Sequence, residues 1–116
     1  MNIAVLQEMA LLRKEERAQG ALLENVQLVL DVLCNEYGEG PEWILRDMTL
    51  SRREECIGIE WLKQNIYCCV YPDEIFVSEV VSSSGDLQVH NERRCQSLTF
   101  ADVQTELKHY LDVMNQ

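Results

Sequence analysis

The side chains in this sequence that could carry covalent chemistry are five cysteines and two histidines. The cysteines are Cys34, Cys56, Cys68, Cys69 and Cys95. A thiol enzyme needs a cysteine beside a base, usually a histidine, that is oriented by a third group. His109 falls on the polar side of a predicted helix, and His90 alternates with the apolar Val89, so we expect both to face water. The pattern favours packed cysteines and surface histidines, and it predicts that the protein is not an enzyme.

Metal and cofactor sites are not predicted either. The cysteine count is odd and no C-x-x-C occurs. Cys68 and Cys69 are neighbours in a predicted strand, so their side chains point to opposite faces and cannot ligate one metal together. No glycine-rich phosphate loop follows a predicted strand. The cysteines lack the spacing of a disulfide framework, which indicates reduced thiols. This predicts a reducing compartment and a cytoplasmic protein.

The net charge of the chain limits the kinds of partner that it is expected to bind. The chain has 20 acidic and 10 basic residues, for a formal net charge of −10. Nucleic-acid binding draws its affinity from Lys and Arg that neutralise phosphates, so we expect no direct binding to DNA or RNA. The N-terminus lacks a basic region before its apolar run, and no apolar run reaches the length of a membrane span. Solubility alone would explain the charge; the sharper interpretation is a partner protein with a basic surface.

A candidate partner-binding surface follows from one predicted hairpin. Tyr67 and Tyr71 point to the same side of a strand, and carboxylates lie close to them. Aromatic side chains are enriched at interface cores, and surrounding acids would select a basic partner. The candidate residues are Glu60, Tyr67, Tyr71, Asp73 and Glu74. This surface would be free if the helices cover only the other face of the sheet; the alternative is that the N-terminal helix covers it.

The elements that must position these residues centre on residues 56–91, where β-branched and aromatic residues are broken by short polar turns. This pattern is typical of an antiparallel meander of three to four strands. A two-residue turn at Gln64-Asn65 would place two apolar sets on one face. The predicted core residues are Ile57, Ile59, Trp61, Ile66, Cys68 and Val70.

The rest of the meander is less determined. In residues 74–82, Ile75 and Val77 compete with Phe76 and Val80 for the buried face. Residues 87–90 are predicted to form a short, final strand at an edge of the sheet. Residues 49–55 are predicted to be a polar connection without secondary structure.

The N-terminal segment, residues 1–37, is predicted to be helical. Apolar positions repeat in a heptad seam with a polar interruption, at Val5, Met9, Leu12, Glu16, Gln19, Leu23, Val26, Leu30, Leu33 and Tyr37. One long helix or a hairpin of two helices hinged near Gly20 would both satisfy it. The seam predicts either a face that packs on the protein's own core or a homodimer.

Two further helices complete the prediction. Pro41 can begin a short helix over residues 41–48, with Trp43 and Leu45 as anchors. Thr99 is a suitable N-cap for a helix over residues 99–115, and Asp102 fits the third position of a capping box. The apolar stripe of that helix comprises Phe100, Val103, Leu107, Tyr110, Leu111 and Met114.

Together these elements predict a single α+β domain over residues 1–116, with helices on one face of an antiparallel sheet. The predicted function is a small acidic, non-enzymatic protein-binding module, such as an inhibitor, immunity or adaptor protein that occupies a basic surface of a larger partner. The alternative is a dimeric structural or chaperone-like protein that associates through its N-terminal helix. A thiol-dependent enzyme is a third, weaker interpretation.

Overall fold

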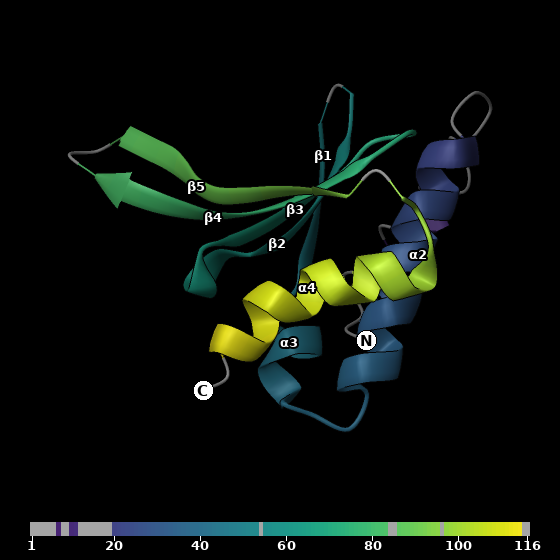
Figure 1. Cartoon of the computed structure of the whole chain (residues 1–116), viewed down its shortest axis with the longest axis horizontal. Coiled ribbons are helices and arrows are strands. Elements are labelled where there is room, and N and C mark those ends of the chain that lie inside the picture. Colours follow the sequence, from purple (N-terminus) through teal and green to yellow (C-terminus); the bar gives the residue numbers. More distant parts are fainter. Residues whose placement is uncertain are drawn as a thin grey trace.

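The computed structural model describes residues 20–53, 55–83, 86–95 and 97–114, together with Gln7, Ala10 and Leu11; in residues 80–83, 86–91, 113 and 114 it describes the backbone alone. The helices are α2 (Gly20–Tyr37), α3 (Glu42–Arg46) and α4 (Phe100–Met114). The strands are β1 (Thr49–Arg52), β2 (Ile57–Trp61), β3 (Ile66–Val70), β4 (Ile75–Ser83) and β5 (Asp86–Cys95). Figure 1 shows the three helices on one side of the sheet, which confirms the predicted α+β architecture.

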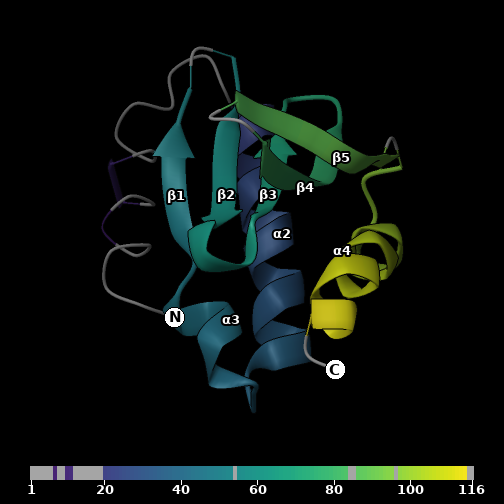
Figure 2. The same cartoon turned by 90° about the vertical axis from the view of Figure 1, so that its left-hand side faces the viewer.

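The sheet is an antiparallel meander in the order β1-β2-β3-β4-β5 (Figure 2). Helix α2 packs beneath β3, and α4 packs beneath β4 and β5. The outer parts of β4 and β5 extend beyond β3, whose first residue Ile66 pairs with Glu79. This part of the hairpin is a two-stranded arm, visible at the left of Figure 1.

The predicted core of the β2–β3 hairpin is confirmed. All six predicted residues are less than a tenth exposed, and all of them except Ile57 are fully buried. The predicted two-residue turn is wrong. A 3-10 turn over Leu62–Gln64 and a left-handed Asn65, with φ 57°, join the strands, so Trp61 pairs with Ile66. This pairing differs from the predicted one by two residues, and an even shift keeps every side chain on its face.

Two strands differ from their predictions. Residues 49–52 form β1 against β2, where a polar connection was expected. Four residues with one large apolar side chain, Leu50, carry too short an alternation to be recognised, and the backbone ladder with β2 supplies the structure. Strand β5 runs from Asp86 to Cys95, well beyond the predicted 87–90. Its polar second half is compatible with an edge strand, which needs few apolar residues.

Strand β4 has a definite buried face. Ile75 and Val77 are each 1% exposed, whereas Phe76 is only half-buried and points the other way. A bulge between Val77 and Glu79 then shifts the register with β5. Bulges of this kind bend a strand and increase its twist, which accompanies the departure of the two-stranded arm from the sheet.

Helix α2 supplies the second half of the heptad seam to the protein's own core. Val26, Leu30, Leu33 and Tyr37 are buried there. The first half of the seam and the choice between one helix and two fall on residues outside the described part of the chain. Asn25 also faces inward, and its side-chain amide donates to the carbonyl oxygens of Tyr71 and Pro72 at 2.8 and 3.0 Å. These bonds fix the β3–β4 turn to the helix.

The two remaining helices close the core. Helix α3 lies within the predicted 41–48, and its Ile44 carbonyl accepts a hydrogen bond from the Trp61 indole at 2.7 Å. Helix α4 begins after Thr99, whose hydroxyl oxygen accepts a hydrogen bond from the Asp102 amide at 3.3 Å. The α4 stripe is buried at Val103, Leu107, Tyr110 and Leu111.

Phe100 and Met114 lie at the two ends of that stripe. Phe100 is 40% exposed, contrary to its predicted place in the stripe, and the neighbouring residues Ala101 and Asp102 in the first turn of α4 are exposed as well. The side chain of Met114 lies outside the described residues. Among the helices that the structure describes, none has the length and apolar character that crossing a bilayer requires.

Candidate functional site

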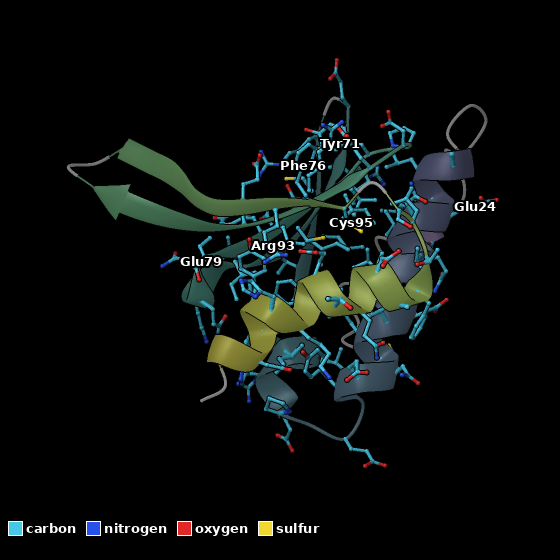
Figure 3. All side chains as sticks on the ribbon, viewed as in Figure 1. Glu24, Tyr71, Phe76, Glu79, Arg93 and Cys95 are labelled. Carbon is cyan, nitrogen blue, oxygen red and sulfur yellow. The ribbon has the colours of Figure 1, made fainter. Side chains whose placement is uncertain are left out.

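One face of the sheet has no described helix against it. Directly opposed residues of an antiparallel pair share a face, and the register pairs Tyr67 with Ser78, Cys69 with Phe76, and Phe76 with Arg94. Figure 3 shows Tyr71 and Phe76 above the sheet, whereas Arg93 and Glu79 point toward α4. We call this surface the open face. It comprises Gly58, Glu60, Tyr67, Cys69, Phe76, Ser78 and Arg94, with Cys56 and Tyr71 at the strand ends.

An aromatic cluster occupies the β3–β4 end of the open face. The rings of Tyr71 and Phe76 meet edge to face, with centroids 5.7 Å apart and planes at 79°. The Arg94 guanidinium lies 5.7 Å from the Phe76 centroid, within the range of a cation–π interaction. Arg94 also donates to Glu74 at 2.6 Å. Each partner restricts the others, so the cluster presents half-buried aromatic area in a fixed geometry.

An ion pair occupies the β1–β2 end. Arg53, just after β1, donates from Nη2 to Oε1 of Glu60 at 2.8 Å, and the Glu60 side chain is only 9% exposed. This hydrogen bond, the largest influence, raises the pKa of Arg53. A Cβ atom at Gly58 would lie 2.9 Å from Glu60 Oε1 and 3.5 Å from Arg53 Nε. The missing side chain of Gly58 therefore makes room for the carboxylate and guanidinium to fold down onto the strand.

Two thiols, those of Cys56 and Cys69, lie next to Tyr71 of the aromatic cluster. Cys56 precedes β2 and is close enough to Cys69 and Tyr71 to influence the pKa of both side chains. Burial, followed by repulsion from Cys56, raises the pKa of Cys69, although Arg53 acts in the opposite direction. Repulsion from Cys56 is also the main cause that raises the pKa of Tyr71. The raised pKa leaves little Cys69 thiolate at neutral pH, so Cys69 is a poor nucleophile.

A thiol–histidine arrangement does not form in the described part of the chain. His109 is exposed on α4, on the other side of the sheet from Cys56 and Cys69, and its ring contacts Tyr110 with centroids 5.2 Å apart. The side chain of His90 is outside the described residues. The remaining buried thiols serve packing: burial strongly raises the pKa of Cys68, and Cys95 donates to the Ser97 carbonyl at 3.2 Å.

The five residues predicted for partner binding lie on or next to the open face, but they are not equally available. Tyr67 and Tyr71 are half-buried within it, and Asp73 is exposed in the β3–β4 turn. The carboxylates of Glu60 and Glu74 are each engaged by an arginine. The predicted residues therefore gather on one side of the molecule, with Asp73 as their most exposed acid.

Sequence reasoning missed Arg53, Phe76 and Arg94 as members of this surface. Phe76 carried a usable signal, because it alternates with the buried Ile75 and Val77. Arg94 is 20 residues from Glu74 in sequence, and only the β4–β5 register brings the two together.

Other parts of the described structure offer weaker sites. A shallow hollow of about 440 Å³ lies at the α2–α3 turn and is lined by Tyr37, Gly38, Glu39, Gly40, Glu42, Leu45 and Arg46. The Tyr37 hydroxyl is already committed, since it donates to Asp112 at 2.7 Å. Within residues 20–53, 55–83, 86–95 and 97–114, no three His, Cys, Asp or Glu side chains form a group that could hold a metal ion.

Comparison with models of protein families, with curated proteins and with solved structures finds no match to this chain. The open face is therefore interpreted from its own contacts, burial and charge.

Proposed function

We propose that this protein is a small acidic, non-enzymatic binding module, of the inhibitor, immunity or adaptor kind, whose open face occupies a basic surface of a larger partner protein. The observation that carries the proposal is the Tyr71–Phe76–Arg94 cluster on a sheet face that no described helix covers. Aromatic and arginine side chains are enriched at the cores of protein interfaces, and tyrosine and arginine are over-represented among the residues that dominate binding energy.

The division of charge supports a basic partner. Glu60 and Glu74 are paired with arginines, so the centre of the open face is nearly balanced in charge. Asp73 and Glu55 are exposed at its rim, and the whole chain carries a formal net charge of −10. In this arrangement the aromatic centre supplies contact, while the rim and the overall charge accelerate encounter with a positive surface.

The buried part of the heptad seam supports this function over the dimeric alternative. Val26, Leu30, Leu33 and Tyr37 pack in the protein's own core, so they are not available to pair with a second copy. Dimerisation through the N-terminal segment would depend on the earlier seam positions, which lie outside the described residues. The raised pKa of Cys69 and its distance from His109, which lies on the other side of the sheet, argue against a thiol enzyme.

Affinity capture from an extract of the source organism, followed by mass spectrometry, tests the proposal. Wild type is compared with Phe76→Ala and with Phe100→Ala, a matched control that removes an exposed phenylalanine, 40% accessible, from α4. Proteins retained by wild type and by Phe100→Ala, but lost with Phe76→Ala, are candidate partners. Circular dichroism confirms that each variant is folded. Equal retention by all three proteins would exclude the open face.

Binding kinetics can then distinguish residues that attract the partner electrostatically from residues that supply contact area. Asp73→Lys should slow association and flatten its dependence on salt, because the variant removes a rim charge that attracts a basic partner. Tyr71→Ala should instead speed dissociation, because it removes contact area. Surface-plasmon measurements at two ionic strengths distinguish these effects. Wild-type kinetics in both variants would place the binding site elsewhere.

A further inference from the structure

Cys56 and Cys69 approach each other across neighbouring strands of the open face. The register pairs Gly58 with Cys69, so Cys56, two residues before Gly58, is the diagonal neighbour of Cys69 on the same face. Burial raises the pKa of Cys69 and Cys56 raises it further, an effect that requires the two thiols to be neighbours. The residue directly opposite Cys69 is Gly58, and the space above this glycine holds the Glu60 carboxylate and the Arg53 guanidinium.

We propose that Cys56 and Cys69 are a dithiol site that closes reversibly to an intramolecular disulfide by exchange with a low-molecular-weight disulfide. To form the disulfide, the two sulfurs must approach to a bond length of about 2 Å. Cys56 can supply this movement because it lies in the loop before β2, outside the strand ladder. The proposal concerns the chain alone and does not depend on the proposed partner.

The exchange proceeds in two balanced steps. The Cys69 thiol is half-buried and Cys56 is 5% exposed, so Cys69 is the group that meets the external disulfide. Its thiolate attacks one sulfur, forms a mixed disulfide and releases one small thiol. The Cys56 thiolate then attacks the Cys69 sulfur of the mixed disulfide and displaces the second small thiol. Two protein S–H bonds are replaced by one S–S bond, the external disulfide is reduced, and the two protons leave with the released thiols.

Cys68 and Cys95 are poor competitors in the folded protein. Cys68 is adjacent to Cys69 in sequence, but it points into the core and is 0% exposed. Cys95 also belongs to the covered face and donates to a backbone carbonyl. Burial raises the pKa of Cys69, so exchange should be slow at neutral pH and accelerate as pH rises.

The test incubates folded wild-type protein with glutathione disulfide at mildly alkaline pH, alkylates the remaining thiols and digests with trypsin. Cleavage after Arg53 and Lys63 separates Cys56, in peptide 54–63, from Cys69, in peptide 64–93. We expect these peptides to be linked, with fragmentation that assigns the bond to Cys69 rather than Cys68. Free thiols in the unfolded, oxidised protein should fall from five to three. Dithiothreitol should restore all five.

Matched variants and an unfolded control sharpen the test. Cys68→Ser should form the link as wild type does, whereas Cys69→Ser should lose it. In concentrated urea, Cys68 and Cys69 become equivalent competitors for Cys56, so the selectivity should disappear. Five remaining thiols in folded wild type, or a link from Cys56 to Cys68 instead, would overturn the proposal. Both readouts use the wild-type chain, so they remain decisive even if a variant fails to fold.

Discussion

Replacement of Leu107 by alanine tests whether α4 is an integral part of the core. Leu107 lies in the middle of the α4 stripe, is 1% exposed and belongs to the main hydrophobic cluster. The substitution removes the three outer carbon atoms of the side chain, worth about 2.4 kcal/mol of transfer free energy at ~0.8 kcal/mol each. The cavity left behind adds to this, so we expect a loss of about 2–5 kcal/mol in the free energy of unfolding.

Urea denaturation followed by circular dichroism measures this loss. The midpoint should fall while the slope with urea stays unchanged, because the surface exposed on unfolding is nearly the same. In a thermal melt, a protein of this size should lose roughly 8–20 °C in Tm, at about 4 °C per kcal/mol. Phe100→Ala in the first turn of α4 is the matched control, since Phe100 is 40% exposed and its loss should cost much less. A loss below about 0.5 kcal/mol for Leu107→Ala, the level of a surface change, would refute the core position of α4.

Three further predictions concern thiols, charge and the α4 cap. All five cysteines are free thiols, so titration of unfolded protein, purified under protection from air, should find five; two intact disulfides would contradict this. Because of the net charge of −10, mobility-shift assays at low salt should detect no binding to DNA or RNA, and tight binding there would overturn the partner argument. Hydrogen bonds from Ser97 and Thr99 lower the pKa of Asp102 below its ordinary 3.8. The stability that the Asp102 carboxylate contributes is therefore present above pH 3.8 and is lost as pH falls below it. Asp102→Asn should flatten this acid dependence in pH-dependent melts, and an unchanged slope would contradict the capping role.

The sequence predicted which faces of the central strands are buried, even though the predicted turn was wrong. Trp61 pairs with Ile66, two residues away from the predicted register, yet both remain in the core. The side-chain period of a strand is two, so an even slip changes partners without changing faces. The N-cap at Thr99 could also be predicted, because the residues that form it lie within one helical turn.

Only part of the candidate site could be predicted, because local patterns place residues of one strand but do not reveal contacts between strands. Tyr67 and Tyr71 could be placed together because they lie on one strand, with Asp73 just beyond. The pairing of Glu74 with Arg94 and of Glu60 with Arg53 could not, because each contact depends on how neighbouring strands pair. These pairings change the role of the two predicted acids: both are occupied within the molecule, and the exposed acidic character moves to Asp73.

By itself, the sequence determined the acidic charge, the order of its main helices and central strands, and the buried positions of β2, β3 and α4. These properties follow from composition and from periodicities of two and 3.6 residues, which act over a few neighbours along the chain. Tertiary structure decided that residues 49–52 form a strand and that Ile75 and Val77, not Phe76, face the core. It also decided that Asn25 fixes the β3–β4 turn and that Cys56 meets Cys69. Each of these depends on a register or packing contact between segments distant in sequence, and no local pattern carries that information.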